Sequence, residues 1–117
     1  MKSKRVDRLN SLLKEVISEV ISRNVKNPYI SELFTVTQVN VTRDLHHAKV
    51  FISVIGSDEE KAQTIKALNQ ASGFIATTAS SKVIIRFFPD LTFYLDSGVE
   101  KQLRIDELLG KINQKED

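Results

Sequence analysis

Aliphatic residues recur at helical spacing through the first part of the chain. Seven of them stand three or four positions apart, which is typical of one face of an amphipathic helix: Val6, Leu9, Leu13, Val16, Ile17, Val20 and Ile21. Asn27-Pro28 prevents the helix from continuing, because the residue before a proline avoids helical backbone angles. We therefore expect one helix over residues 4–24, followed by a short connection.

The next two segments follow the alternating pattern of strands. Residues 33–44 are rich in valine and threonine, which favour a pleated surface. Their apolar positions change face between Val36 and Val39, so an extra residue near Thr37-Gln38 predicts a β-bulge. Residues 48–55 alternate regularly, and the short turn before them predicts an antiparallel pair.

The second half of the chain begins with a helix start. Ser57 and Glu60 have the spacing of a capping box, which predicts a helix over 58–72 with Ala62, Ile65 and Leu68 inward. A glycine inside a helix costs about 1 kcal/mol relative to alanine, so Ser72-Gly73 marks a bend between this helix and a second helical stretch.

A third strand is predicted over 83–95, where Pro89 indicates a sheet edge or a bulge because it cannot donate to a ladder. The helical crossover from strand two to strand three makes that pair parallel and the connection right-handed. A short helix is expected over 100–112. The fold class is thus α+β, with a three-stranded mixed sheet packed against helices.

Composition narrows the class of protein. The chain has 117 residues, 41% of them hydrophobic, which suits one domain with a core. It has no cysteine and no apolar run long enough for a membrane span. We expect a cytoplasmic, monomeric protein with no membrane partner, and a single domain over 1–117 with a basic flexible start at 1–5 and a flexible tail at 113–117.

The basic residues are concentrated at the N-terminus. Residues 1–14 contain five basic residues and one acidic residue, whereas the rest of the chain has a slight acidic excess. Such an arm is a common electrostatic footprint for nucleic acid, although a solvated helix start gives the same pattern.

Catalytic and metal-binding patterns are missing from the sequence. The two histidines, His46 and His47, are neighbours and would point to opposite sides of an extended chain. No histidine stands in a sequence pattern that would activate a serine as a nucleophile. Gly73 is a single glycine and is not part of a GxxxxGK(S/T) phosphate-binding motif. We expect no enzyme activity, no catalytic residue, no metal and no cofactor.

Two helices joined at a tight corner and followed by a strand resemble the KH fold in its type II, bacterial form, whose glycine loop clamps nucleic-acid backbone. Here the corner reads Ala71-Ser72-Gly73 instead of GxxG. We expect Gly73 to adopt a left-handed or restricted conformation there. The N–H groups of Gly73, Phe74 and Ile75 would then face a phosphate, unless the corner serves packing alone.

The chain closely resembles the ribosome-binding factor A family. The matching stretches are RVDRLNSLLKEVISEVI at 5–21, VTRDLHHAKVFISV at 41–54, ASGFI at 71–75, PDLTFYLD at 89–96 and VEKQLRIDELL at 99–109. The resemblance implies a non-enzymatic bacterial factor that binds the small ribosomal subunit and its ribosomal RNA late in maturation. It also implies support of ribosomal RNA processing, including in the cold.

The chain departs from the family pattern at several basic positions. Ala76, Ser81 and Ile84 stand where the family usually has basic residues, and Asn27-Pro28-Tyr29 replaces its Asp-Pro-Arg. We expect the RNA-binding surface to comprise Lys4, Arg5, Arg8, Arg43, Ala71, Ser72, Gly73, Lys82 and Arg86.

An alternative is a protein-interaction module, in which the first helix and an exposed sheet edge bind a ribosomal protein or another assembly factor. The near-neutral charge outside the arm favours it. Salt dependence separates the two, because binding to phosphate weakens steeply with salt.

Overall fold

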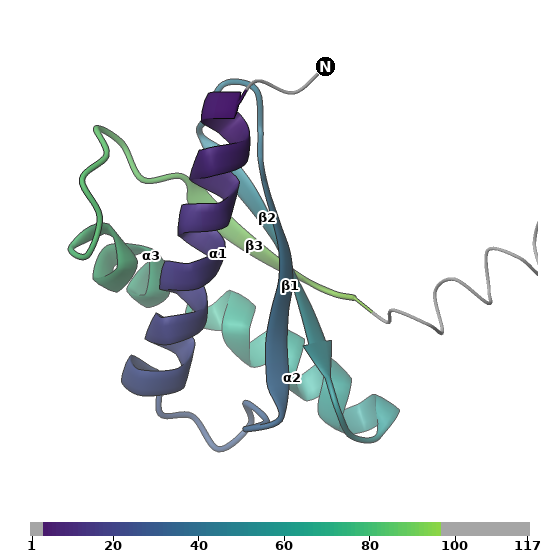
Figure 1. The fold of residues 1–117 in the computed structure, drawn as a ribbon. Coiled ribbons are helices and arrows are strands. Elements are labelled where there is room, and N and C mark those ends of the chain that lie inside the picture. Colours follow the sequence, from purple (N-terminus) through teal and green to yellow (C-terminus); the bar gives the residue numbers. More distant parts are fainter. Residues whose placement is uncertain (1–3, 97–117) are drawn as a thin grey trace, which may run out of the picture.

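The computed structural model describes residues 4–96, which form three helices and three strands (Figure 1). In chain order these are α1 (Lys4–Asn24), β1 (Phe34–Val41), β2 (His47–Val54), α2 (Asp58–Gln70), α3 (Ser72–Ser80) and β3 (Asp90–Leu95). The predicted order of elements is confirmed within this range. The helix expected over 100–112 and the tail at 113–117 lie outside the described residues. Lys4 and Arg5 lie in the first turn of α1.

β2 is the centre of the sheet, with β1 antiparallel on one side and β3 parallel on the other. The predicted bulge is present, because the register jumps from Val36↔Ile52 to Gln38↔Phe51 and leaves Thr37 without an opposite residue on β2. This extra residue keeps Val36 and Val39 on the same, buried face despite their odd separation.

The helices cover the face of the sheet that carries the apolar side chains. α1 packs against β1 and α3, while α2 and α3 pack against β3. All five predicted α1 residues from Leu13 to Ile21 are buried in this core, together with Val50 and Ile52 of β2 and Phe93 of β3. The opposite face carries the stacked rings of Phe51 and Tyr94, whose centroids are 5.7 Å apart.

The capping box at the start of α2 is confirmed, since the Glu60 N–H donates to Ser57 Oγ and the Ser57 N–H to Glu60 Oε1. The expected inward face is partly wrong, because Ala62 is exposed and Thr64 is buried instead. Thr64 Oγ1 accepts the Ser31 N–H at 3.2 Å and lies 2.8 Å from the Glu60 carbonyl oxygen. A buried hydroxyl with these partners ties the α1–β1 connection to α2.

The third strand is shorter than predicted, since it covers only Asp90–Leu95 rather than 83–95. Its register explains the difference: Asp90 pairs with His47, the first residue of β2. In a parallel pair, any earlier residue of β3 would have to pair with the turn before β2, which is not a strand. Residues 81–89 therefore form a loop, and Pro89 precedes the edge strand.

Both outer edges of the sheet carry an asparagine amide from a helix. Asn10 Oδ1 of α1 accepts the N–H of Val41 at 3.0 Å on the β1 edge. On the β3 edge, Asn69 of α2 accepts the N–H of Phe93 at 2.8 Å and donates to its carbonyl oxygen at 3.0 Å. These contacts satisfy backbone groups that an added strand would use.

Candidate nucleic-acid interface

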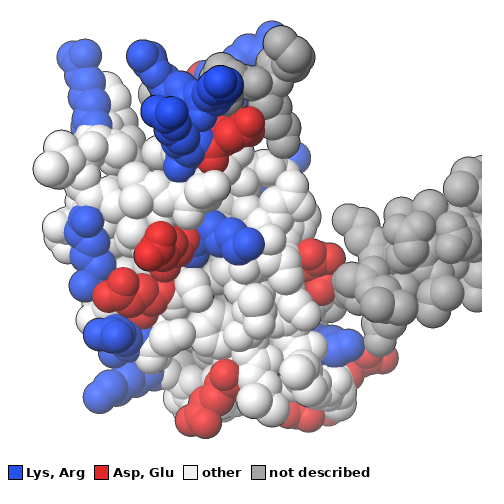
Figure 2. All heavy atoms as spheres, viewed as in Figure 1, with Lys and Arg blue, Asp and Glu red and all other residues white. Residues whose placement is uncertain are grey.

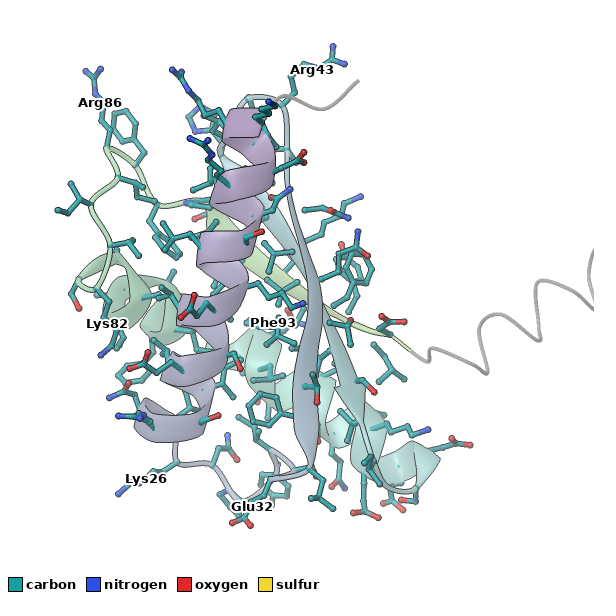
Figure 3. The ribbon with its side chains drawn as sticks, viewed as in Figure 1. Lys26, Glu32, Arg43, Lys82, Arg86 and Phe93 are labelled. Carbon is teal, nitrogen blue, oxygen red and sulfur yellow. The ribbon has the colours of Figure 1, made fainter. Side chains whose placement is uncertain are left out.

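Several predicted basic residues converge on one end of the molecule. Lys4, Arg5 and Arg8 are exposed on the first turns of α1, and Figure 2 shows Lys and Arg side chains gathered at this end. Arg43 and Arg86, labelled in Figure 3, extend from the same end on different segments, while Lys26 lies at the opposite end of α1. We call this set (Lys4, Arg5, Arg8, Arg43 and Arg86) the basic end.

A hydrogen-bonded turn presents Arg43 at the tip between β1 and β2. Asp44 Oδ1 accepts the hydroxyl of Thr42 at 2.6 Å and the N–H of His46 at 3.0 Å. The hydrogen bond from Thr42 is the main cause that lowers the pKa of Asp44. Leu45 completes the turn with a positive φ of 64°.

The bend between α2 and α3 lies at Ala71, the first residue of the predicted Ala71-Ser72-Gly73 corner. Ala71 has φ −94° and ψ 7°, between the last residue of α2 and the first of α3. Its N–H donates to the Ala67 carbonyl at 3.0 Å, and its own carbonyl accepts the N–H of Ile75 at 2.9 Å. A single residue in this bridge conformation ends one helix and starts the next, and alanine tolerates it.

The expected conformation of Gly73 is wrong. Gly73 is the second residue of α3, its φ is not positive, and a Cβ added to it would meet no atom within 4 Å. The expectation for Ile75 is also wrong, because its N–H is used inside the helix and cannot face a phosphate. The bend needs no left-handed residue, so glycine at this position is not required by backbone geometry.

The predicted RNA-binding residues do not form one continuous cluster. Arg43 and Arg86 lie level with the start of α1, whereas Lys82 lies nearer the middle of its length in the same view (Figure 3). The bend at Ala71–Gly73 lies at the α2–α3 junction, which is also away from the start of α1 (Figure 1). Ser72 is half-buried and Gly73 exposed.

Two exposed apolar residues stand among the predicted basic ones. Ile84 is fully exposed and Phe87 is 69% exposed, both in the loop between α3 and β3. The sequence pattern assigned them to a strand and therefore missed them. Pro89 could have indicated that these residues are outside the strand, because it separates the apolar residues 83–88 from the residues that enter the sheet.

The described residues offer little for other site chemistry. Within residues 4–96 no group of three or more His, Asp or Glu side chains is placed to hold a metal ion. No helix among them is long and apolar enough to cross a membrane. A hollow of about 770 Å³ lies between the end of α1 and the connection to β1, lined by apolar Ile21, Val25 and Phe34 together with Lys26 and Glu32.

The order α-β-β-α-bend-α-β over a three-stranded mixed sheet defines a KH-like α+β domain of type II. Residues 5–109 match the model of the family described as ribosome-binding factor A. The chain belongs to this family.

Individual relatives cover nearly the whole chain. Ribosome-binding factor A of Protochlamydia amoebophila (strain UWE25) is 63% identical over 114 residues, which are 97% of this chain and 87% of that protein. The crystal structure of ribosome-binding factor A from Thermus thermophilus matches the fold with a TM-score of 0.67 at 23% identity, over 77% of this chain and 94% of that one.

A homology model of the Thermus thermophilus factor, fitted into a cryo-electron microscopy map of a 30S complex, matches with a TM-score of 0.60 at 22% identity. It covers 73% of this chain and 88% of that one. At this identity the match concerns the fold.

Proposed function

We propose that this protein is a ribosome assembly factor that binds the small ribosomal subunit, through its ribosomal RNA, during late maturation. Membership of the ribosome-binding factor A family supports the proposal, as does the 30S complex of the Thermus thermophilus relative. The structural observation that carries it is the basic end, where α1, the β1–β2 turn and the α3–β3 loop bring cations together (Figure 2).

The mechanism is occupation of an RNA site rather than catalysis. Five exposed cations on three separate segments suit contacts to several phosphates of an RNA backbone. Lys82 and the bend at Ala71–Gly73, near the two ends of α3, form a separate part of the proposed contact. The protein acts as a monomer in the cytoplasm, without a cofactor, and shapes its site until maturation is complete.

Sedimentation of a tagged copy in a cell lysate tests this proposal. We expect the protein to migrate with free small subunits rather than with translating ribosomes. Equal distribution over both fractions, or migration with neither, would contradict the assembly role. On depletion of the protein, small-subunit RNA precursors should accumulate, and more strongly in the cold.

A protein-interaction role is the second candidate, with a ribosomal protein or another assembly factor as the partner. The hollow beside Phe34 favours it, since a mixed apolar and charged depression suits a protein side chain. The sheet edges offer less support for a protein-interaction role than the sequence suggested. Asn10 already accepts the N–H of Val41 on the β1 edge, and Asn69 already bonds to the backbone of Phe93 on the β3 edge. A subunit affinity that hardly changes with salt would support this second role.

A further inference from the structure

Within the α3–β3 loop, residues 81–88 bury part of their side chains and so hold the backbone in place. Val83, Ile85 and Phe88 are half-buried and pack against the hydrophobic core. The loop is closed at one end by the Lys82 N–H, which donates to the Ala79 carbonyl at 3.0 Å. At the other end the Asp90 N–H donates to the His46 carbonyl at 2.8 Å.

The remaining side chains of this loop are presented to solvent. Ile84 is fully exposed and Phe87 is 69% exposed, and Phe87 directly follows exposed Arg86 in the chain. The guanidinium carbon of Arg86 is 5.3 Å from the centroid of the Phe87 ring, within the range of a cation–π contact. Because these two side chains are exposed rather than packed in the core, they are available for an external contact.

The charge of the surrounding segment selects the kind of partner. From Lys61 to Pro89 the chain contains four basic residues and no aspartate or glutamate. Two of the four, Lys82 and Arg86, belong to the loop, and Arg86 also belongs to the basic end (Figure 3). A flat exposed ring next to cations, without acidic residues, complements a polyanion that carries aromatic bases.

We propose that residues 81–88 bind unpaired RNA, with a base stacked on Phe87, Ile84 in apolar contact with the same strand, Arg86 on a phosphate beside that base and Lys82 on a phosphate further along the strand. The proposal rests on the proposed function and names the RNA class for this part of its surface. Unpaired nucleotides fit because an aromatic ring can stack only on a base that is free of its own neighbours, whereas a duplex hides its base faces. The loop is also a different element from the α2–α3 bend.

The absence of tryptophan from the chain permits a direct test. Phe87→Trp places a single fluorescent indole at the proposed stacking position in the full chain. We expect its emission to be quenched by a single-stranded RNA of about ten nucleotides, a length within the range of known single-strand sites. A duplex of the same sequence should quench it much less. Tyr29→Trp, at an exposed position in the α1–β1 connection, is the control and should not respond.

Affinity measurements separate stacking from charge. Phe87→Ala should weaken binding to the single strand about tenfold and leave the salt slope unchanged, because the charge of the protein stays the same. Arg86→Gln should reduce that slope by about 1. Phe87 is exposed, so the folded state should persist in both variants, as urea unfolding can verify.

The outcomes distinguish this inference from the proposed function. If Phe87→Ala binds single strands and small subunits normally, while loss of Lys4, Arg5 and Arg8 abolishes subunit binding, the loop inference is overturned and the assembly role stands. If Phe87→Ala loses subunit binding but Phe87→Trp is not quenched by RNA, the loop contacts a ribosomal protein and the RNA inference is likewise overturned. If the wild type does not migrate with small subunits, the proposed function fails, and quenching by the single strand still decides whether the loop binds RNA.

Discussion

At the residue scale, backbone conformation is decided at two positions near the candidate interface. Ala71 bends the chain between α2 and α3 with ordinary negative φ, whereas Leu45 adopts the left-handed region in the β1–β2 turn. Left-handed backbone is favourable for glycine and unfavourable for leucine. The left-handed position in the turn is therefore occupied by Leu45 and not by glycine. Gly73, in contrast, has a helical conformation that other residues could also adopt.

Replacement of Gly73 should raise stability. Gly73 lies in α3 with negative φ and open space where a Cβ would stand, so Gly73→Ala should increase the free energy of unfolding by about 0.4–1 kcal/mol. Urea unfolding measures the change. A loss of stability in Gly73→Ala would show that the residue adopts a restricted conformation after all.

Leu45 offers the opposite case. Leu45→Gly should stabilise the turn by up to about 1 kcal/mol, since a left-handed φ costs a non-glycine residue roughly that much. Leu45→Val should destabilise it, because a β-branched side chain tolerates this conformation least. Thermal unfolding of the two variants gives the comparison. Melting temperatures that move in the same direction would contradict the assignment of strain to this residue.

At the element scale, β3 is an edge strand that is held by one neighbouring strand and packs against α2 and α3. Its inner side pairs with β2 in parallel, and at its outer side Asn69 of α2 replaces a missing strand at Phe93. This explains how a strand of six residues, preceded by a loop, remains in register at the edge of the sheet. It also leaves less of that edge for an added strand.

Loss of the Asn69 amide should therefore loosen β3. Asn69→Ala leaves the backbone N–H and carbonyl of Phe93 without their partners, which should cost about 1–3 kcal/mol of stability. Gln70→Ala, the exposed neighbour on the same helix, should change stability by less than about 0.5 kcal/mol. Hydrogen exchange of the Phe93 amide should accelerate in the first variant only. If both variants were equally stable, Asn69 would not stabilise the β3 edge.

At the scale of the whole molecule, the fold turns a short basic segment into a broader surface. The start of α1 lies at the same end as the tips of the β1–β2 turn and the α3–β3 loop, so Arg43 and Arg86 join Lys4, Arg5 and Arg8 (Figures 2 and 3). Such convergence raises the local potential more than the net charge of +2 suggests.

Removal of the three α1 cations should weaken binding to the small subunit without unfolding the protein. The side chains of Lys4, Arg5 and Arg8 are exposed, so alanine at all three should leave stability nearly unchanged. The slope of log affinity against log salt should decrease in magnitude by about 2–3, because each cation that neutralised a phosphate accounts for close to one unit of it. An unchanged slope would mean that this arm touches no phosphate.

A matched control removes three cations elsewhere. Arg23 and Lys66 are exposed, like Lys26, which lies at the far end of α1 (Figure 3). Their combined replacement by alanine changes the net charge by the same amount. We expect subunit affinity and its salt slope to stay close to those of the wild type. A loss equal to that of the α1 variant would indicate that total charge, rather than the basic end, sets the affinity.

Local patterns in the sequence were enough to determine several elements of this protein. The spacing of Leu13 to Ile21, the Ser57–Glu60 capping box and the change of face after Val36 each depend on neighbours within a few residues, so α1, the start of α2 and the bulge were predictable. The family match and the absence of catalytic patterns were also readable from the residues alone.

The tertiary structure alone decided the features that depend on distant partners. β3 begins at Asp90 because β2 begins at His47, and Thr64 is buried because its hydroxyl meets the backbone of Ser31. Phe87 lies in a loop rather than a strand because the same register leaves residues 81–89 outside the sheet. Periodicity reports which side of an element is apolar, but register, edges and the convergence of charges arise only when elements far apart in sequence pack together.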